Sequence, residues 1–115
     1  MPLFEIRSYH FEPTKFDEYK KWAETYAVPH LKRIHDVVGF WVSNEMAPIY
    51  GSSLPKDEEM QPANITWIIR WEDRAQRDRG TEERGSDPEW EAIMDRVPGG
   101  RASYLRTEVK FATEI

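Results

Sequence analysis

Residues 3–11 read LFEIRSYHF, and this stretch decides how the sheet of the protein is assembled. Its side chains alternate with period two, which predicts a β-strand. One face of this strand would carry Phe4, Ile6, Ser8 and His10, and the other would carry Leu3, Glu5, Arg7, Tyr9 and Phe11. Neither face is simply apolar, because a glutamate, an arginine and a tyrosine stand in a row between two hydrophobic ends. The other strands are needed to decide which face meets the core.

The segments that follow predict the order β-α-β-β-α-β. Aromatic and small residues recur at helical spacing over 14–34 and predict an amphipathic helix. Pro29 lies inside this pattern and should kink or divide the helix, because proline has no N–H for the helical ladder. Runs rich in β-branched and aromatic residues predict further strands over 37–46, 64–71 and 101–112.

Two helices are predicted between the third and fourth strands. The almost wholly polar segment 74–85 predicts an exposed helix, which begins after Asp73 and ends at Gly85. The motif Ser86-Asp87-Pro88-Glu89 predicts the start of a short second helix. This order is typical of a ferredoxin-like α+β domain over residues 1–115, in which a four-stranded antiparallel sheet carries its helices on one face.

Composition excludes several classes of function. The formal net charge is −5 and no Lys/Arg-rich run is present, so we expect no nucleic-acid partner. There is no cysteine, which rules out disulfides and thiolate metal sites. No stretch approaches the roughly 20 apolar residues of a membrane span, and no signal segment precedes the first strand, so we expect a cytoplasmic protein. No phosphate-binding glycine loop or metal-ligand spacing is present, so we expect no cofactor and no metal.

The two faces of the sheet can be assigned from polarity. The more apolar set is predicted to meet the helices: Phe4, Ile6, Val38, Phe40, Val42, Trp67, Ile69, Trp71, Leu105 and Val109. A mixed set is predicted to face away from them: Glu5, Arg7, Tyr9, Trp41, Ser43, Thr66, Ile68, Arg70, Tyr104, Arg106 and Glu108. Because unpaired charges are costly to bury and large apolar side chains are costly to expose, we expect a second copy to cover the mixed face. The resulting homodimer would enclose cavities between its two sheets.

Several short motifs resemble those of NIPSNAP proteins. They are FEIRSY at 4–9, the P-x-K-hydrophobic-x-x-Y pattern at 13–19, PHLKR at 29–33 followed by VVGFW at 37–41, WIIRWED at 67–73, and DPEW at 87–90. The resemblance spans nearly the whole chain and implies a dimeric α/β barrel, in which the sheets of two ferredoxin-like monomers face each other. The loop over 47–63 is longer than in small members of the family and could act as a lid or decorate an edge. The superfamily includes cofactor-free monooxygenases, haem-degrading enzymes and lactone isomerases, so no single activity is implied.

The mixed face supplies the candidate site. Arg7 or Arg106 would stabilise an anion, and Glu5, Tyr9 or His30 would move a proton. The side chains expected to contact a ligand are Trp41, Arg70, Tyr104 and Glu108. The hypothesis is that the protein binds, and could convert, a small molecule that is partly aromatic or carries a carbonyl group. Cofactor-independent acid–base chemistry of an isomerase, lyase or monooxygenase type would fit this site.

Two other interpretations of the same residues stay open. The charges could form a salt-bridge network that only sets the register of a non-catalytic scaffold dimer. Alternatively, His30 or His10 could ligate the iron of a bound haem. His30 also has a simpler interpretation, because it falls on the inward stripe of the first helix, where a hydrogen-bonded structural histidine would be expected.

Overall fold

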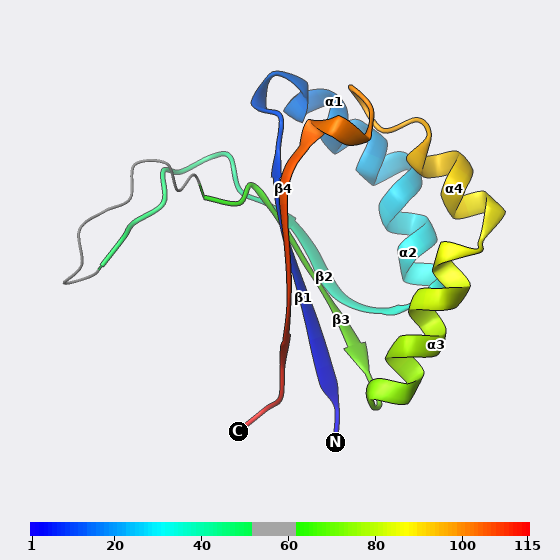
Figure 1. The fold of residues 1–115 in the computed structure, drawn as a ribbon. Coiled ribbons are helices and arrows are strands. Elements are labelled where there is room, and N and C mark those ends of the chain that lie inside the picture. The colour runs from blue at the N-terminus through cyan, green and yellow to red at the C-terminus, as the bar shows by residue number, and fades with distance from the viewer. Residues whose placement is uncertain (52–61) are drawn as a thin grey trace.

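The computed structural model describes residues 1–51 and 62–115, and it has the predicted ferredoxin-like α+β order (Figure 1). The elements are β1 (Leu3–Phe11), α1 (Phe16–Trp22), α2 (Val28–Ile34), β2 (Asp36–Val42), β3 (Ile65–Trp71), α3 (Arg74–Gly85), α4 (Pro88–Met94) and β4 (Tyr104–Ala112). The strands form one sheet in the order β2-β3-β1-β4, and every neighbouring pair is antiparallel. All four helices pack on one side of this sheet (Figure 1). The predicted loop over 47–63 falls partly on 52–61, outside the described residues.

The first helical region is interrupted just before Pro29, whereas a kink or division was predicted at Pro29 itself. A π-helical turn, η2 (Ala23–Ala27), connects α1 to α2, and Pro29 occupies the first turn of α2. The π turn thus closely precedes the residue that has no N–H for the helical ladder. The π turn directs Ala23 and Ala27 into the core, where small side chains let the helix pass close to the sheet.

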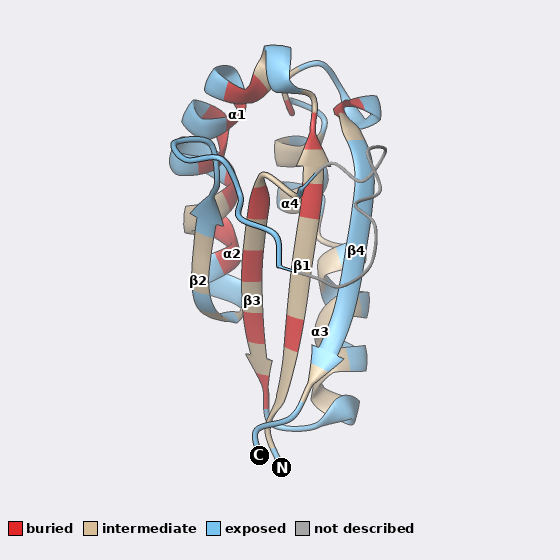
Figure 2. Cartoon of the chain, turned by 90° about the vertical axis from the view of Figure 1, so that its left-hand side faces the viewer, coloured by how far each residue is buried: buried red, intermediate tan, exposed pale blue. Residues whose placement is uncertain are grey.

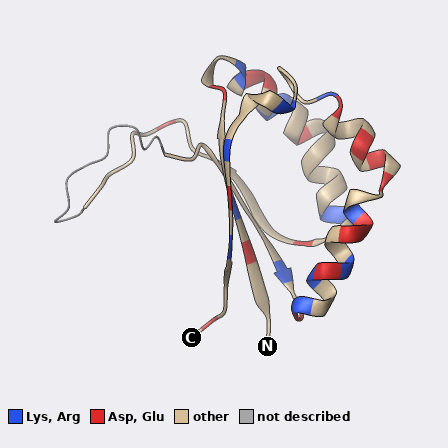
Figure 3. Ribbon diagram, viewed as in Figure 1, with Lys and Arg blue, Asp and Glu red and all other residues tan. Residues whose placement is uncertain are grey.

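The starts of α3 and α4 also match the sequence signals. Asp73 caps α3 by accepting a hydrogen bond from the Gln76 N–H at 2.8 Å, and Asp87 caps α4 by accepting one from the Glu89 N–H at 3.0 Å. Helix α3 buries no residue fully, and basic and acidic positions follow one another along it (Figure 3). The predicted exposed helix is therefore confirmed. None of the helices in residues 1–51 and 62–115 is long and apolar enough to cross a membrane.

The predicted assignment of faces is wrong for β1. Residues directly opposite each other in an antiparallel pair share a face, and Glu5, Arg7 and Tyr9 lie opposite Ile69, Trp67 and Ile65 of β3. These three residues of β3 are buried beneath the helices. The glutamate, arginine and tyrosine of the opening strand therefore face the helices, whereas Phe4 and Ile6 lie on the other face.

The remaining strands follow the predicted faces except at three positions. One of them is Leu105, which was predicted to meet the helices but is 60% exposed and falls at a register break. Register breaks occur in β2 between Val37 and Gly39 and in the β1–β4 pairing after His10. Because a bulge resets the alternation of side chains, Val38 is exposed and Tyr104 lies on the helix side, each opposite to its prediction. The residues that keep their predicted faces are Phe40, Val42, Trp67, Ile69, Trp71 and Val109 beneath the helices, and Trp41, Thr66, Ile68, Arg70, Arg106 and Glu108 on the other face.

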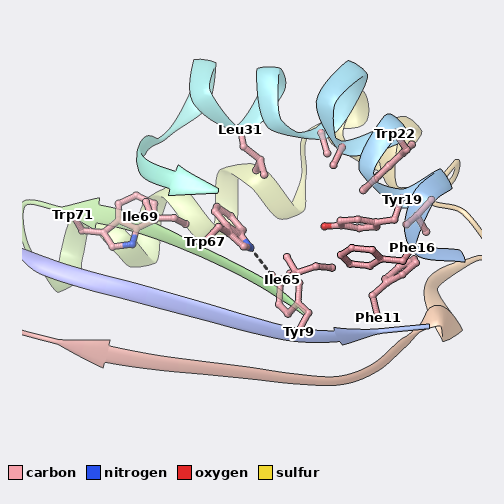
Figure 4. Packing of buried hydrophobic residues seen from close by; sticks show 13 residues of the cluster. Tyr9, Phe11, Phe16, Tyr19, Trp22, Leu31, Ile65, Trp67, Ile69 and Trp71 are labelled. Atoms are coloured by element: carbon pink, nitrogen blue, oxygen red, sulfur yellow. Dashed lines mark hydrogen bonds between the residues drawn. The ribbon is translucent and has the colours of Figure 1, made fainter. Parts of the chain in front are cut away.

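The core lies between the sheet and the helices and is rich in aromatic side chains (Figure 4). The rings of Phe11 and Tyr19 pack with their centroids 4.4 Å apart, and those of Tyr19 and Trp22 with centroids 5.4 Å apart. Each large aromatic side chain buries far more area than an aliphatic one, so this core compensates for a modest aliphatic content. The opposite face of the sheet, turned toward the viewer in Figure 2, is covered by no helix in the described part of the chain.

Candidate functional site

A cavity of about 310 Å³ lies within the single chain, between the sheet and the helices. Its walls are mainly aromatic: Tyr19, Trp22, Phe40, Trp67, Trp90 and Tyr104. Polar side chains also line it, namely Arg7 and Tyr9 from β1, Arg84 from α3 and Thr107 from β4. Arg7 and Tyr9 were predicted to line a cavity between two facing sheets, and this placement is wrong because the charged row of β1 faces the helices.

Glu5 anchors the polar part of this region. Its side chain is fully buried, and each carboxylate oxygen accepts a bond from a different arginine. Arg7 Nη1 donates to Oε2 at 2.6 Å, and Arg77 Nε, reaching down from α3, donates to Oε1 at 2.9 Å. Burial alone would raise the pKa of Glu5, but the hydrogen bonds from Arg77 and Arg7 outweigh it and the pKa is lowered. The carboxylate therefore stays ionised and fixes the position of Arg7.

The hydroxyl of Tyr9 is held by two donors. Arg7 Nε donates to the phenolic oxygen at 2.6 Å, and the indole N–H of Trp67 donates to the same oxygen at 3.0 Å (Figure 4). The Arg7 guanidinium also lies 5.6 Å from the centroid of the Trp67 ring. Glu5, Arg7, Tyr9 and Trp67 thus form one continuous network that ends at the cavity.

Arg84 is the charged group with the least compensation in the site. Its Nη1 donates to Nε2 of His35 at 3.0 Å, and among the described residues no carboxylate forms an ion pair with it. Burial lowers the pKa of Arg84, and the positive charge of Arg7 lowers it further. Burial, followed by the charge of Arg84, also lowers the pKa of His35, to about 4. His35 is therefore neutral near pH 7 and contributes no charge to the site.

Two other tyrosines of the cavity are held in the neutral form. Burial raises the pKa of both Tyr19 and Tyr104, and their rings pack edge-on with centroids 6.3 Å apart. The Tyr104 ring packs edge-on against Tyr9, with centroids 5.4 Å apart. Tyr104, a predicted ligand contact, does line the cavity.

His30 does not line the cavity. Its Nε2 lies 2.7 Å from Asp87 Oδ2, its Nδ1 lies 3.1 Å from Arg33 Nη2, and its ring stacks on Trp90. Nε2 thus joins α2 to the start of α4 and Nδ1 contacts Arg33 of the same helix, as expected for a structural helix histidine. His10 lies on the opposite face of the sheet, across from Arg106. Neither histidine is placed to ligate the iron of a haem in this cavity.

The structure separates the remaining predicted site residues from the cavity. Trp41, Arg70, Arg106 and Glu108 all lie on the face of the sheet away from the helices. Arg70 pairs there with Glu72 at 2.8 Å. Within residues 1–51 and 62–115, no group of three or more acidic or histidine side chains is arranged to hold a metal ion.

Sequence reasoning missed Arg84, Arg77 and the donor role of Trp67. Both arginines lie in a segment whose composition indicates a solvated helix, and no apolar periodicity marks the turns that face the sheet. Trp67 was assigned correctly to the covered face, but its partner Tyr9 was assigned to the other face. The register of β1 against β3, which is not readable from sequence, was the missing information.

Comparison with solved structures identifies the fold. A NIPSNAP domain protein from Burkholderia xenovorans, itself uncharacterised, superposes with a TM-score of 0.73 at 17% identity, covering 98% of this chain and 94% of that chain. A NIPSNAP family protein from Agrobacterium tumefaciens superposes with a TM-score of 0.75 at 14% identity, covering 100% and 94%. This chain has the NIPSNAP fold.

The NIPSNAP fold agrees with the resemblance seen in the sequence motifs. No family model matches the sequence, and no curated protein matches it either. A further neighbour is a putative antibiotic biosynthesis monooxygenase from Bacteroides thetaiotaomicron, with a TM-score of 0.59 and 13% identity over 99% of this chain and 90% of that chain. At these identities the likeness extends to the fold and not to an activity.

Proposed function

We propose that the cavity between the sheet and the helices binds a small, partly aromatic anion, and that Arg84 supplies its counter-charge. The observation that carries the proposal is that Arg84 lines the cavity without a carboxylate partner among the described residues. Taking a guanidinium out of water costs several kcal/mol unless an opposite charge accompanies it. A bound carboxylate, phenolate or enolate would provide that charge.

The other arginines of the region are already compensated. Arg7 and Arg77 share the carboxylate of Glu5. In addition, Arg77 Nη1 lies 3.4 Å from Asp78 Oδ1. Two carboxylates thus serve these two guanidinium groups, and the positive charge of Arg84 is left over. This surplus lies inside a protein whose formal net charge is −5, so it is a local feature of the site.

The size and walls of the cavity limit the ligand. A dry apolar cavity of roughly 150 Å³ is enough to hold a benzene ring, so about 310 Å³ suits a single substituted ring. The indoles of Trp22, Trp67 and Trp90 offer flat surfaces on which such a ring can pack. Any chemistry would be cofactor-independent acid–base chemistry of an isomerase, lyase or monooxygenase type. The monooxygenase neighbour supports this only through its shared fold.

Fluorescence titration tests the binding proposal, because three tryptophans line the cavity. Phenylacetate is a suitable probe, since it combines one ring with one carboxylate. We expect it to quench the fluorescence of the wild-type protein, and Arg84→Gln to weaken its binding at least about 10-fold, as the loss of a charge-assisted hydrogen bond implies. Arg79→Gln is the matched control, because Arg79 is an exposed residue of the same helix. If phenylacetate binds both variants equally well, Arg84 is not the anion site.

We also infer that two copies of the chain pack with their uncovered faces together. This face carries Phe4, Ile6, Ile68 and Trp41 from three adjacent strands, and Trp41 is 48% exposed in the single chain. Exposed apolar patches of this kind mark interaction surfaces, and two-fold symmetric self-association is the commonest way to cover them. The charges on the same face, including Arg106 and Glu108, would then set the register between the two copies.

A further inference from the structure

The oxygen of the Tyr9 hydroxyl accepts two hydrogen bonds, but its proton has no acceptor among the described residues. A phenolic hydroxyl offers one proton and accepts hydrogen bonds on its oxygen. Arg7 Nε and Trp67 Nε1 both donate to this oxygen, at 2.6 Å and 3.0 Å. Both contacts are N–H donors, so neither can accept the proton of Tyr9. Among the described residues no other group accepts it, and the side chain borders the cavity. The Tyr9 O–H is therefore free to donate to whatever occupies the cavity.

The other tyrosines of the cavity lack this arrangement. Among the hydrogen bonds of the described residues, no guanidinium or indole N–H donates to the hydroxyl of Tyr19 or Tyr104. Tyr9 instead receives a bond from a guanidinium whose own position is fixed by Glu5. Donors aimed at a phenolic oxygen strengthen the O–H as a hydrogen-bond donor, because they stabilise the negative charge that builds up on that oxygen. Tyr9 is thus set apart as the strong neutral donor of the site.

We propose that Tyr9 donates its hydroxyl proton in a hydrogen bond to a carbonyl or enolate oxygen of the ligand, so that the cavity takes an aromatic oxo acid. This inference rests on the proposed function, in which Arg84 holds the carboxylate. The three parts of such a molecule match three parts of the cavity. The carboxylate meets the guanidinium, the second oxygen meets the hydroxyl, and the ring packs on the indoles.

A pair of probes isolates the contribution of the second oxygen. Phenylglyoxylate and phenylacetate share a ring and a carboxylate at the same spacing, but only phenylglyoxylate has a ketone oxygen beside the carboxylate. We expect the wild-type protein to bind phenylglyoxylate about 10-fold more tightly than phenylacetate, which corresponds to one additional good hydrogen bond. Tyr9→Phe should abolish this preference while leaving the dissociation constant for phenylacetate within about 2-fold. Tyr26→Phe, which removes an exposed tyrosine hydroxyl, should leave the preference unchanged.

A second measurement needs no variant. Tyr9→Phe also removes the acceptor used by Arg7 and Trp67, so it could unfold the protein. The infrared stretch of a ¹³C-labelled ketone in phenylglyoxylate should move to lower frequency on binding to the wild-type protein, because a hydrogen bond to the oxygen weakens the C=O bond. An unshifted stretch, or equal affinity of the wild type for the two probes, would overturn the role of Tyr9. It would leave the Arg84 site intact, whereas failure of both probes to bind would overturn the proposed function itself.

Discussion

The two faces of the sheet carry similar mixtures of residue types but place their charges in opposite settings. On the covered face, Glu5 is fully buried and both of its oxygens are bonded to arginines. On the uncovered face, Arg106 and Glu108 are exposed beside partly exposed apolar side chains such as Ile6 and Ile68. The difference teaches that a charged residue in a strand does not mark the solvent side when its partners come from the covering helix.

The covered face also separates structural charge from charge available to a ligand. Glu5, Arg7 and Arg77 compensate one another, whereas Arg84 lines the cavity with only a neutral imidazole as its partner. The first three groups account for the stability of the buried row, and Arg84 accounts for the anion selectivity that we propose. Substitutions in the buried row of the covered face should therefore reduce stability, whereas substitutions on the uncovered face should reduce self-association.

The largest effect is expected from breaking the buried network. Glu5→Ala leaves Arg7 and Arg77 without their shared counter-ion, and the loss of one partner from a buried ion pair costs about 3–5 kcal/mol. Urea denaturation should show a loss of this size in the free energy of unfolding. Glu108→Ala is the matched control on the uncovered face, and we expect no measurable change in stability from it. Equal effects of the two variants would contradict the contrast between the faces.

The contribution of Glu5 to the stability of the covered face depends on pH, and the direction of this dependence follows from its lowered pKa. The pKa of Glu5 is lowered in the folded protein, so its contribution to stability is fully present above the ordinary value of 4.5 and is lost as the pH falls through the lower folded value. The stability of Glu5→Ala should therefore decline less steeply than that of the wild type below about pH 4.5. A parallel decline would mean that the carboxylate is not ionised in the folded state.

The order of elements was predictable from the sequence because its signals are local. These signals are period-two alternation, the cap at Asp73 and the cap-and-proline pair Asp87-Pro88, and each acts within a few residues. The faces were only partly predictable, because polarity assigned β3 correctly but failed for the charged row of β1. Arg77 helps to compensate the buried charge of that row by donating a hydrogen bond to Glu5. The two residues are 72 positions apart, and no sequence periodicity relates Arg77 to Glu5.

The candidate site was predicted in part for the same reason. Arg7, Tyr9 and Glu5 were identified as a functional group, and the structure does bring them together. Arg106, which was grouped with them, lies on the other face because the strand register sets it opposite His10. The sheet has only two faces, so an error in the face of one strand separated Glu5, Arg7 and Tyr9 from the predicted site residues of the other strands, such as Arg70 and Arg106.

The second largest effect is expected on self-association. Ile68→Asp places a charge in the middle of the uncovered face, where β3 pairs with β1 and β2. If two copies meet there, the substitution should weaken the dimer at least about 30-fold, as is typical of a central interface residue. Analytical ultracentrifugation over a concentration series measures this directly, with an unchanged circular dichroism spectrum to show that the fold survives.

Lys32→Asp is the control for charge reversal on the outer, exposed side of α2, and it should leave the dimer intact. A wild-type protein that sediments as a monomer at micromolar concentration would refute the proposed packing. The uncovered face would then be a solvated surface despite its apolar residues, and only the covered face would be of functional interest.

The smallest effect is expected from replacing one of two histidines. One is His35, which lies beside Arg84, and the other is His10, which lies on the uncovered face. His35 lies beside Arg84, Trp71 and the Glu5–Arg7 pair, and burial followed by the charge of Arg84 lowers its pKa to about 4. Between about pH 4 and the ordinary value of 6.5, the unfolded chain binds a proton at this histidine that the folded protein does not. Stability should therefore rise with pH in this window, by at most about 1.4 kcal/mol for each pH unit.

His35→Gln should flatten this slope between about pH 5 and 6.5. The amide oxygen of glutamine can still accept the hydrogen bond from Arg84, so little else need change. His10→Gln on the uncovered face should alter the slope less, because the pKa of His10 is lowered by burial and by Arg106 but remains closer to its ordinary value. Denaturation midpoints across the pH series, taken as differences from the wild type, distinguish the two sites. A larger change in slope for His10→Gln would mean that His10 on the uncovered face, and not His35 beside Arg84, is the more strongly desolvated imidazole.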